Sequence, residues 1–386
     1  MTYVLFLGNK ILLVADQNTF GVAGDKTVEV LGDKLFDKVI FSGEKILIPN
    51  EESIEKVENS LCDADLIVGI GSGVIQDLCK YVSFDKKVPY LIVATAPSMD
   101  GYASTGAAMI TGGMKVTYSA GLPLAIVADV DVLKDSPMEM IKSGYGDIIG
   151  KYSSLNDWKL SALVNGEYFC QYIYDVTFSM IEKTVALADG LIKRDFDSVK
   201  TLMEALTVVG IMMSFATTSR PASGSEHHLS HFFEIVGIVR NEDYFPHGID
   251  VAYSTIETAK IREKLVKEDF DKQNYRDDKQ TLLSKLQAVY GDSVGEGCFK
   301  LHEKLGTYDK NRYQIYVDNQ NEIKEILKEM PTAKEVEDIL AKVGYDKKEF
   351  YALYGDKKIK EALVYAKDIK DRYSVLWLNY DLNGEN

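Results

Sequence analysis

The chain has 386 residues, more than a single hydrophobic core usually supports, so we expect two domains. Hydrophobic residues make up 46% and charged residues 27%, a balance typical of a folded globular protein. The formal net charge of −15 argues against a nucleic-acid backbone or an anionic membrane surface as the main partner.

The N-terminal stretch and the cysteines favour an intracellular protein. Residues 1–13 are apolar but lack the basic leader and the small-residue cleavage site of a signal peptide. Since no run approaches about 18 apolar residues, we expect no membrane span and a cytoplasmic location. The four cysteines are far apart and form no CxxC pair, so we expect buried free thiols at Cys62, Cys79, Cys170 and Cys298.

Short apolar runs alternate with helical segments over the first hundred residues. The apolar runs have the length of strands and cover residues 10–15, 38–41, 65–70 and 89–94. Helical patterns lie between them, at residues 17–31, 53–62 and 74–83. Continuous apolar strands separated by helices are typical of a parallel sheet covered on both faces. The sequence therefore predicts an α/β N-terminal region.

The periodicity changes near Pro137. Before this point, the Gly-Gly pair at 112–113 predicts a hairpin within residues 108–119, and residues 124–130 form one more strand. After it, apolar residues recur at helical spacing over residues 141–164, 172–188 and 199–216. We therefore predict an α/β domain over residues 1–137 and an all-helical domain over residues 138–386.

Further along, Thr332 and Glu335 form a capping box that predicts the start of a helix. The charged residues of the final third are most simply read as solvated helix faces.

Two polar loops follow consecutive predicted strands. Gly69, Gly71 and Gly73 lie where a strand turns into a helix, a position that favours phosphate, although a purely structural turn explains them equally well. The spacing is not the GxGxxG fingerprint, because Val74 occupies the place of its last glycine. Residues 95–104 form the second loop, at the same expected sheet edge. Together the two loops indicate a nucleotide-sized site.

Four of the five histidines lie between Arg220 and Asp250. Such crowding favours a metal or proton-transfer site over four unrelated structural histidines. Spacing alone pairs His227 with His231 on one helix face, and His228 points about 100° away. Asp147, taken alone, is an acid near a helix N-terminus. The ligand set therefore stays open at this point.

Several separated motifs together resemble one family. They are GSGVIQD, TAPSMDGYAS, GYGDIIGKYSSLNDWKL, RPASGSEHHLSHFFE, PHGIDVA, KLGTYDKNRY and KDIKDRYSVLWL. These segments are similar to those of the sn-glycerol-1-phosphate dehydrogenases, and most of all to the bacterial type encoded with arabinose-utilisation genes. That family lies within the iron-containing alcohol dehydrogenase and glycerol dehydrogenase superfamily. The resemblance implies a Rossmann-like α/β domain followed by a helical domain, an architecture related to dehydroquinate synthase.

The resemblance also implies roles for individual residues. The metal ligands would be Asp147, His227 and His247, with His231 as a further catalytic residue. Substrate contacts would come from Asp100, Asp147 and His231. Cofactor contacts would come from Asp16, Gly73, Val74, Ile75, Gln76, Asp77, Thr95, Ser98 and Ser104. For the substrate phosphate, Lys151 and Arg220 are the nearby cations.

The expected activity is reversible, NAD(P)-dependent reduction of dihydroxyacetone phosphate to sn-glycerol 1-phosphate. Asp16 would favour NAD over NADP, and zinc, nickel or iron would suit the ligands. The expected partner is a small phosphorylated triose or polyol, and the expected assembly a homodimer or higher homo-oligomer. Two enzymatic alternatives are a dehydrogenase of unphosphorylated glycerol or polyols and a dehydroquinate-synthase-like cyclase. An interaction protein with a vestigial site is the non-enzymatic alternative.

Overall fold

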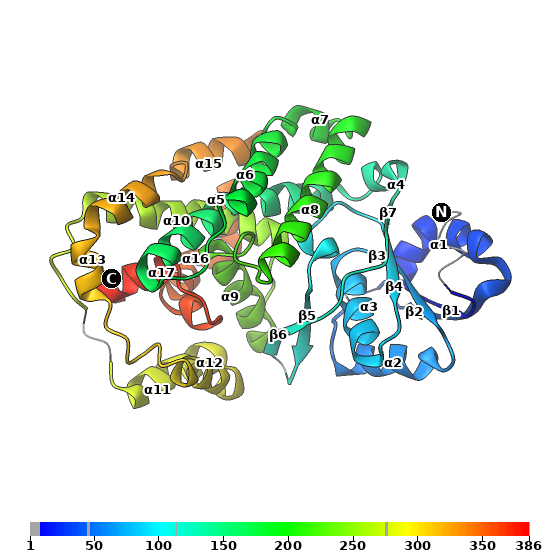
Figure 1. Cartoon of the computed structure of the whole chain (residues 1–386), viewed down its shortest axis with the longest axis horizontal. Coiled ribbons are helices and arrows are strands. Elements are labelled where there is room, and N and C mark those ends of the chain that lie inside the picture. Colours follow the sequence, from blue (N-terminus) through cyan, green and yellow to red (C-terminus); the bar gives the residue numbers. More distant parts are fainter. Residues whose placement is uncertain (1–7, 45–46, 113, 275–276, 386) are drawn as a thin grey trace. The chain divides into compact units, whose positions relative to one another are not determined.

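A five-stranded parallel sheet dominates the first part of the chain (Figure 1). The computed structural model describes residues 8–44, 47–112, 114–274 and 277–385. The strand order is β2-β1-β3-β4-β7, and every neighbouring pair is parallel. The predicted parallel sheet is confirmed. Its strands are β1 (Ile11–Asp16), β2 (Leu35–Phe41), β3 (Leu66–Gly71), β4 (Tyr90–Ala94) and β7 (Ile126–Ala128).

One face of this sheet packs against helix α1 (Gln17–Leu31). Because side chains alternate across a strand, every second residue of β1, β3 and β4 reaches the same buried cluster. Ala23 and Leu31 supply the helix side of that cluster. Helix α2 (Glu51–Leu61), capped by Asn50, follows β2.

Helix α3 (Gly73–Lys86) packs closely against the sheet because of two glycines in β3. A Cβ atom at Gly69 would lie 2.9 Å from Sγ of Cys79. One at Gly71 would lie 2.7 Å from Cβ of Ile75. Contacts this short do not occur in packed interiors, so any larger residue would push α3 away. These glycines therefore have a packing role whether or not a ligand binds nearby.

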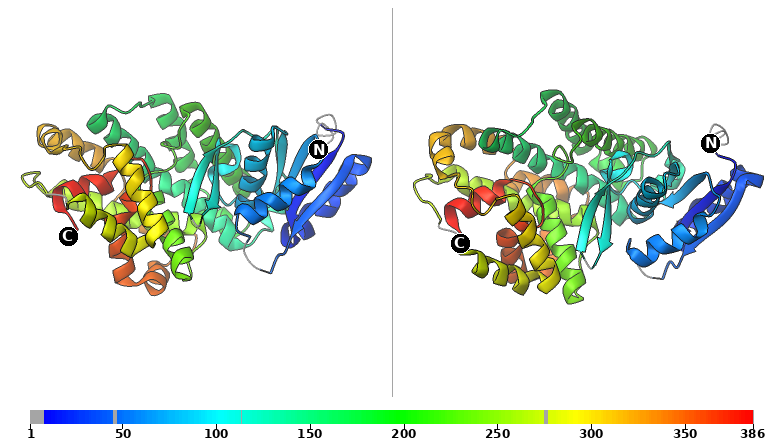
Figure 2. Two further views of the ribbon diagram at one scale, coloured as in Figure 1. Left: turned by 90° about the horizontal axis from the view of Figure 1, so that it is seen from below. Right: turned by 60° about the horizontal axis from the view of Figure 1, so that its bottom comes forward.

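The predicted hairpin is confirmed (Figure 2, adjacent cyan arrows). Strands β5 (Gly106–Thr111) and β6 (Met114–Ser119) pair antiparallel. Gly112 adopts φ 58°, a left-handed conformation that costs glycine little. The other turn residue, Gly113, lies outside the described residues, as do residues 1–7 of the apolar N-terminal stretch.

The chain divides into two compact units that differ from simple N- and C-terminal halves. The first comprises Met1–Ile148 and Ala186–Ser219, and the second Ile149–Val185 and Arg220–Asn386. The long helix α5 (Met138–Asn165) crosses the division in sequence. The domain boundary near residue 137 stays a prediction, whereas the compact units separate eleven residues later.

Helix α8 (Phe196–Ala216) belongs to the first unit because it packs on the short helix η3 (Asp100–Ala103). Among the described helices, it is the one long and apolar enough by composition to cross a membrane. Lys200 and Glu204 interrupt its sequence, so a search for unbroken apolar runs misses it. Core helices of folded domains pass the same test. Its contacts with η3 and with two short helices, α4 (Val130–Lys134) and α7 (Ala188–Ile192), account for its composition.

Within the described residues of the second unit, the regular elements are all helical, in agreement with the predicted helical region. Asp157 of α5 joins several of these helices. Its carboxylate pairs with Arg262 at 2.7 Å and accepts backbone N–H groups at the first residues of two helices, Ser225 and Val375. A buried anion at two helix N-termini is favourable because the positive ends of both helix dipoles point at it.

Besides the C-terminal part of α5, the helices of the second unit are α6 (Gln171–Val185), α9 (Ser225–Arg240), α10 (His247–Lys267), α11 (Lys279–Tyr290), α12 (Asp292–Lys304), α13 (Tyr313–Asp318), α14 (Gln320–Lys328), α15 (Ala333–Ala341), α16 (Lys347–Tyr365), η4 (Ala366–Asp368) and α17 (Val375–Asn383).

The capping box of Thr332 and Glu335 is confirmed at the start of α15. The interpretation of Asp147 as a helix N-terminal acid is wrong, because α5 begins at Met138 and Asp147 lies in its interior. The cysteines are free, and Cys79 and Cys298 are buried as predicted. Cys170 is only partly buried, and Cys62 is exposed because it lies at the C-terminal end of α2 in a positive-φ turn.

Candidate functional site

The carboxyl edge of the parallel sheet brings together the residues predicted for the cofactor. The chain passes from β1 to β2 on one side and then to β3 on the other, so the strand order reverses between β1 and β3. Ligands of open α/β sheets bind at such a switch point. Asp16 ends β1, the Gly71-Ser72-Gly73 turn ends β3, and Thr95 follows β4 on the neighbouring strand. The topology thus supports the predicted nucleotide position independently of any motif.

Asp16 also has a structural role. Its carboxylate accepts the backbone N–H of Thr19 at 2.9 Å and forms a capping box at the start of α1. The side chain remains partly exposed at the sheet edge.

The predicted cofactor residues of α3 divide by burial. Gly73, Val74 and Asp77 are partly exposed at the start of the helix, whereas Ile75 and Gln76 are buried. The Gln76 amide donates to the Tyr102 carbonyl at 3.0 Å and to the Tyr90 hydroxyl at 3.1 Å. The structure therefore ties Gln76 to the protein interior.

The second loop is held by a residue that sequence reasoning missed. Lys80 is fully buried on α3, and its ammonium donates to the carbonyl oxygens of Gly101 at 2.8 Å and Gly106 at 2.9 Å. It also lies 3.5 Å from Asp77 and 3.3 Å from the Ser104 hydroxyl. Burial lowers the pKa of Lys80, while the Asp77 carboxylate opposes that shift. Its position three residues after Asp77 on a helix was the available signal.

Helix α5 lies directly against the same loop, which comprises residues 95–104. The Ser143 hydroxyl donates to the Ser98 carbonyl at 3.0 Å, and the Asp100 N–H donates to the Asp147 carboxylate at 2.9 Å. Gly144 makes this approach possible, since a Cβ atom there would lie 1.9 Å from the Pro97 carbonyl oxygen. Thr95, Ser98, Asp100 and Ser104 are all buried in the resulting arrangement.

Asp147, His227 and His247 come together as a group that could hold a metal ion. Each offers one ligand atom, and these three atoms lie within 4.8 Å of one another. The ring centroids of the two histidines, His227 and His247, are 5.0 Å apart. One carboxylate and two imidazoles suit a divalent transition metal and leave positions for other ligands.

The surroundings of the two histidines fit such a role. Nδ1 of His227 lies 2.7 Å from the Glu226 carboxylate, and Nδ1 of His247 lies 3.2 Å from the Ser230 hydroxyl. With Nδ1 engaged, Nε2 is the nitrogen that each ring would present to a metal. Burial, followed by the charge of Lys151, lowers the pKa of His227 well below its usual value. A neutral imidazole is the form that binds metals.

Glu226 is a second residue that sequence reasoning missed. It is fully buried, and burial with the nearby Asp157 charge raises its pKa to about 7. The same carboxylate oxygen that contacts His227 accepts the Gly224 N–H at 2.7 Å. Glu226 directly precedes the His-His pair, but sequence rules based on the spacing of metal ligands do not consider residues that only contact a ligand.

The other two clustered histidines take different places. His231 is buried beside the group, with its ring centroid 6.1 Å from that of His227 and 5.4 Å from that of His247. His228 is fully buried, and neither ring nitrogen has a hydrogen-bond partner among the described residues. His228 is not part of the potential metal group.

The two cations predicted near the substrate phosphate also differ. Arg220 is engaged by Glu167, with Nη2 at 2.6 Å from the carboxylate, and by the Tyr373 carbonyl at 2.6 Å. Lys151 is fully buried and donates to the Ala222 carbonyl at 3.0 Å. Arg220 thus serves the packing of its surroundings.

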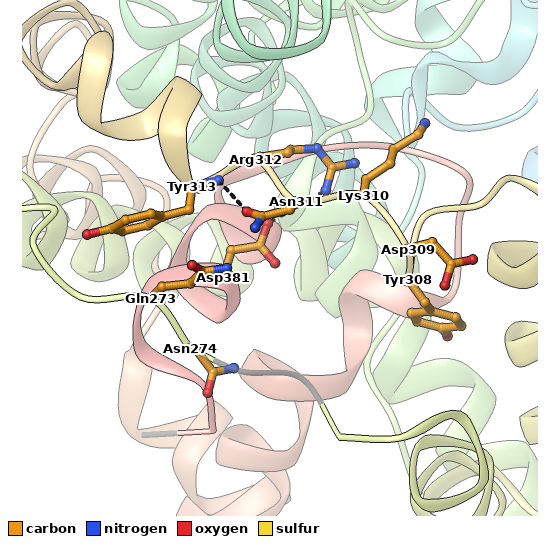
Figure 3. A pocket seen from close by; sticks show the side chains of 9 residues that line it. All are labelled: Gln273, Asn274, Tyr308, Asp309, Lys310, Asn311, Arg312, Tyr313 and Asp381. Carbon is orange, nitrogen blue, oxygen red and sulfur yellow. Dashed lines mark hydrogen bonds and ion pairs between the residues drawn. The ribbon is translucent and has the colours of Figure 1, made fainter.

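A small polar hollow of about 150 Å³ lies elsewhere in the second unit (Figure 3). Arg312 and Asp381 lie 3.6 Å apart on its wall, and the Tyr313 N–H donates to the Asn311 side chain at 3.0 Å. None of the predicted site residues lines it. The remaining lining residues are Gln273, Asn274, Tyr308, Asp309 and Lys310.

The chain is similar to known dehydrogenases over most of its length. Residues 5–137 match the family model of iron-containing alcohol dehydrogenases. The chain is 31% identical over 343 residues to a Geobacillus thermodenitrificans glycerol-1-phosphate dehydrogenase [NAD(P)+], covering 87% of this chain and 77% of that protein. A Halalkalibacterium halodurans protein of the same name is 28% identical over 372 residues, covering 95% and 85%. The fold resembles a probable glycerol dehydrogenase of Sinorhizobium meliloti, with TM-score 0.59, 16% identity, and 97% and 87% of the chains covered.

Proposed function

We propose that this chain, which belongs to the NAD(P)-dependent glycerol-1-phosphate dehydrogenase family, catalyses the reversible reduction of dihydroxyacetone phosphate to sn-glycerol 1-phosphate. The family membership makes it an oxidoreductase that acts on a small polyol phosphate. The observation that carries the proposal is the convergence of Asp147, His227 and His247 in a chain similar to these enzymes over most of its length. The stereochemistry of the product rests on the family alone.

The three converging residues would hold one divalent cation, with zinc, nickel or iron as the candidates. When bound, the nicotinamide cofactor supplies the hydride and the cation stabilises the negative charge that develops on the substrate C2 oxygen. Glu226 orients His227, and Ser230 orients His247, so both rings are held ready before substrate arrives.

Two side chains would position the substrate. His231 lies beside the histidine pair and would hold a proton at its ring nitrogen near the substrate hydroxyl group. The Asp100 carboxylate would accept a hydrogen bond from a substrate hydroxyl group. The bond from the Asp100 N–H to Asp147 holds this residue beside the candidate metal group. Both assignments are supported by the family resemblance and by the position of these residues.

For the cofactor, the carboxyl edge of the sheet is the proposed site. The backbone N–H groups of the turn at Gly73 and Val74 would receive the phosphates at the N-terminus of α3, and Asp77 would contact another part of the cofactor. Asp16 would receive the adenosine ribose and favour NAD over NADP. Thr95, Ser98 and Ser104 would complete the contacts, with Ile75 and Gln76 supporting the turn from beneath. A dissolved substrate and cofactor fit a cytoplasmic enzyme, and a homodimer or higher homo-oligomer remains a prediction.

The main alternative is a dehydrogenase of unphosphorylated glycerol or a related polyol. It is less supported, because the relatives that cover most of the chain carry the phosphate-substrate name, and the similarity to glycerol dehydrogenases concerns the fold. A cyclase resembling dehydroquinate synthase would regenerate its NAD and consume no net NADH.

One experiment separates these functions. The purified protein is analysed for metal, and NADH oxidation is followed with dihydroxyacetone phosphate and with dihydroxyacetone. The proposal expects metal-dependent turnover that strongly favours the phosphate ester. Equal rates on the two ketones, or no NADH loss after metal is restored, would refute it.

Variants test the residue assignments in the same preparation. Asp147→Asn and His247→Ala are expected to lose metal, whereas His231→Ala keeps metal but turns over poorly. Asp197→Asn, an exposed acid on α8, is the matched control and should keep both properties. Loss of metal in His231→Ala would instead place His231 among the ligands.

A further inference from the structure

Three cations converge on two consecutive residues just before helix α9. Lys151 donates to the Ala222 carbonyl at 3.0 Å. Lys370 donates to the Ser223 hydroxyl at 3.2 Å, and Arg372 donates to the Ser223 carbonyl at 3.2 Å. The last two come from the segment between η4 and α17, about 150 residues further along the chain. Their convergence is therefore a product of the fold.

The same turn leads straight into the candidate metal group. Ser223 lies four residues before His227, and α9 begins at Ser225, so the positive end of its dipole faces this turn. Lys151 lies four residues after Asp147 on α5, which places it one helical turn along the same face. Lys151 is thus one helical turn from Asp147, and Ser223, which Lys370 and Arg372 contact, lies four residues before His227.

Cationic side chains lie close together at this turn, in a chain whose net charge is −15. Burial and then the charge of Arg220 lower the pKa of Arg372 to about 10. A bound anion beside Arg372 would offset the repulsion from Arg220.

Three of the nearby acids contact other groups, and the fourth, Asp371, is exposed to solvent. Asp157 pairs with Arg262 at 2.7 Å, and Glu226 contacts His227 at 2.7 Å. Glu167 pairs with Arg220 at 2.6 Å. This last pair also removes Arg220 as the primary anion ligand, since its guanidinium is held in the protein interior.

We propose that Lys370 and Arg372 form the subsite for the phosphate group of the substrate, with the buried Lys151 strengthening the local field. The inference rests on the proposed function and deepens it by naming the residues that select a phosphate monoester over a free polyol. A phosphate monoester carries nearly two negative charges at neutral pH and has several acceptor oxygens. The planar guanidinium of Arg372 can donate two parallel N–H groups to them, and Lys370 adds a mobile point charge. Lys370 and Arg372 each keep part of their surface exposed, although most of the Arg372 guanidinium is shielded by protein.

The test compares the two ketones in Lys370→Met and Arg372→Met. KM for dihydroxyacetone phosphate should rise by about tenfold or more in each variant, because a charge-assisted hydrogen bond is lost. KM for dihydroxyacetone should change by less than about twofold, and competitive inhibition by inorganic phosphate should weaken by a factor similar to that for the phosphate ester. Metal content should stay at the wild-type level. Lys360→Met, which removes an exposed lysine of α16, controls for the change in overall charge.

Arg372→Lys guards against a folding defect, since it keeps the charge but not the paired donors, and an intermediate KM is expected. Equal losses on both ketones in the folded variants would overturn the inference and make these residues supports of the Ser223 turn. Unchanged phosphate selectivity in all variants would overturn it as well. A wild-type enzyme that does not prefer the phosphate ester would refute the proposed function itself, which is a distinguishable result.

Discussion

Replacing Gly144 with alanine tests how the second loop is positioned against α5. A Cβ atom at this position would lie 1.9 Å from the Pro97 carbonyl oxygen and 2.9 Å from the Pro97 carbonyl carbon. Since a close carbon–oxygen contact needs about 3.3 Å, loop and helix must separate by roughly 1.4 Å. The atoms in conflict are backbone atoms, so no side-chain rotation relieves them. The loop that carries Asp100 must therefore move.

The expected cost follows from two opposing terms. Alanine favours a helix over glycine by about 1 kcal/mol, so a free helical site would be stabilised. Overpacking typically costs about 1–3 kcal/mol, which should exceed that gain. Movement of the loop should also stretch the 2.9 Å hydrogen bond from the Asp100 N–H to Asp147. Misplacement by about 1 Å can cost on the order of 100-fold in turnover.

The measurements are thermal unfolding, metal content and NADH-dependent reduction of dihydroxyacetone phosphate. Gly144→Ala should melt at a lower temperature and lose most of its kcat/KM. Gly21→Ala is the matched control, because Gly21 also lies within a helix, α1, and a Cβ atom there meets nothing within 4 Å. If Gly144→Ala retained wild-type stability and turnover, the close approach of loop and helix would not position the site.

Other predictions address the metal, the pH response and a remote helix. Glu226→Gln should weaken metal affinity by about 10- to 100-fold, measured by chelator competition, because His227 loses its charged partner; unchanged affinity would deny that role. Burial lowers the pKa of His302 in the folded protein, so the unfolded chain takes up a proton on this side chain at a higher pH than the folded chain does. The free energy of unfolding should therefore fall as the pH drops below about 6.5, the usual histidine pKa. In His302→Gln, the slope of the urea-unfolding free energy against pH below this value should decrease by up to about 1.4 kcal/mol per pH unit. An unchanged slope would show that His302 does not cause this pH dependence. Thr332→Ala should cost about 1 kcal/mol in chemical unfolding through loss of the α15 cap while leaving KM unaltered.

Much of the fold could be read from local patterns. The apolar runs of β1, β3 and β4 and the hairpin at Gly112 were predictable, because strand burial and turn chemistry depend on neighbouring residues. The capping box at Thr332 is likewise a contact over three residues. The motifs also indicated the family, since its functional segments keep their order along the chain.

What the amino-acid sequence determined by itself was thus the parallel sheet, the helical second part and the clustering of four histidines. Spacing alone favoured His231 as a ligand, whereas the family resemblance implied His227 and His247. The folded chain brings these two to Asp147, because His247 joins them from the start of another helix. The roles of Lys80, Glu226 and Gly144 also required the fold, as each depends on a loop or side chain brought near by packing. The convergence of Lys370 and Arg372 on Ser223 joins residues about 150 positions apart. Periodicity reports the environment of one element, whereas a site is formed by side chains from several elements whose meeting depends on how the whole chain packs.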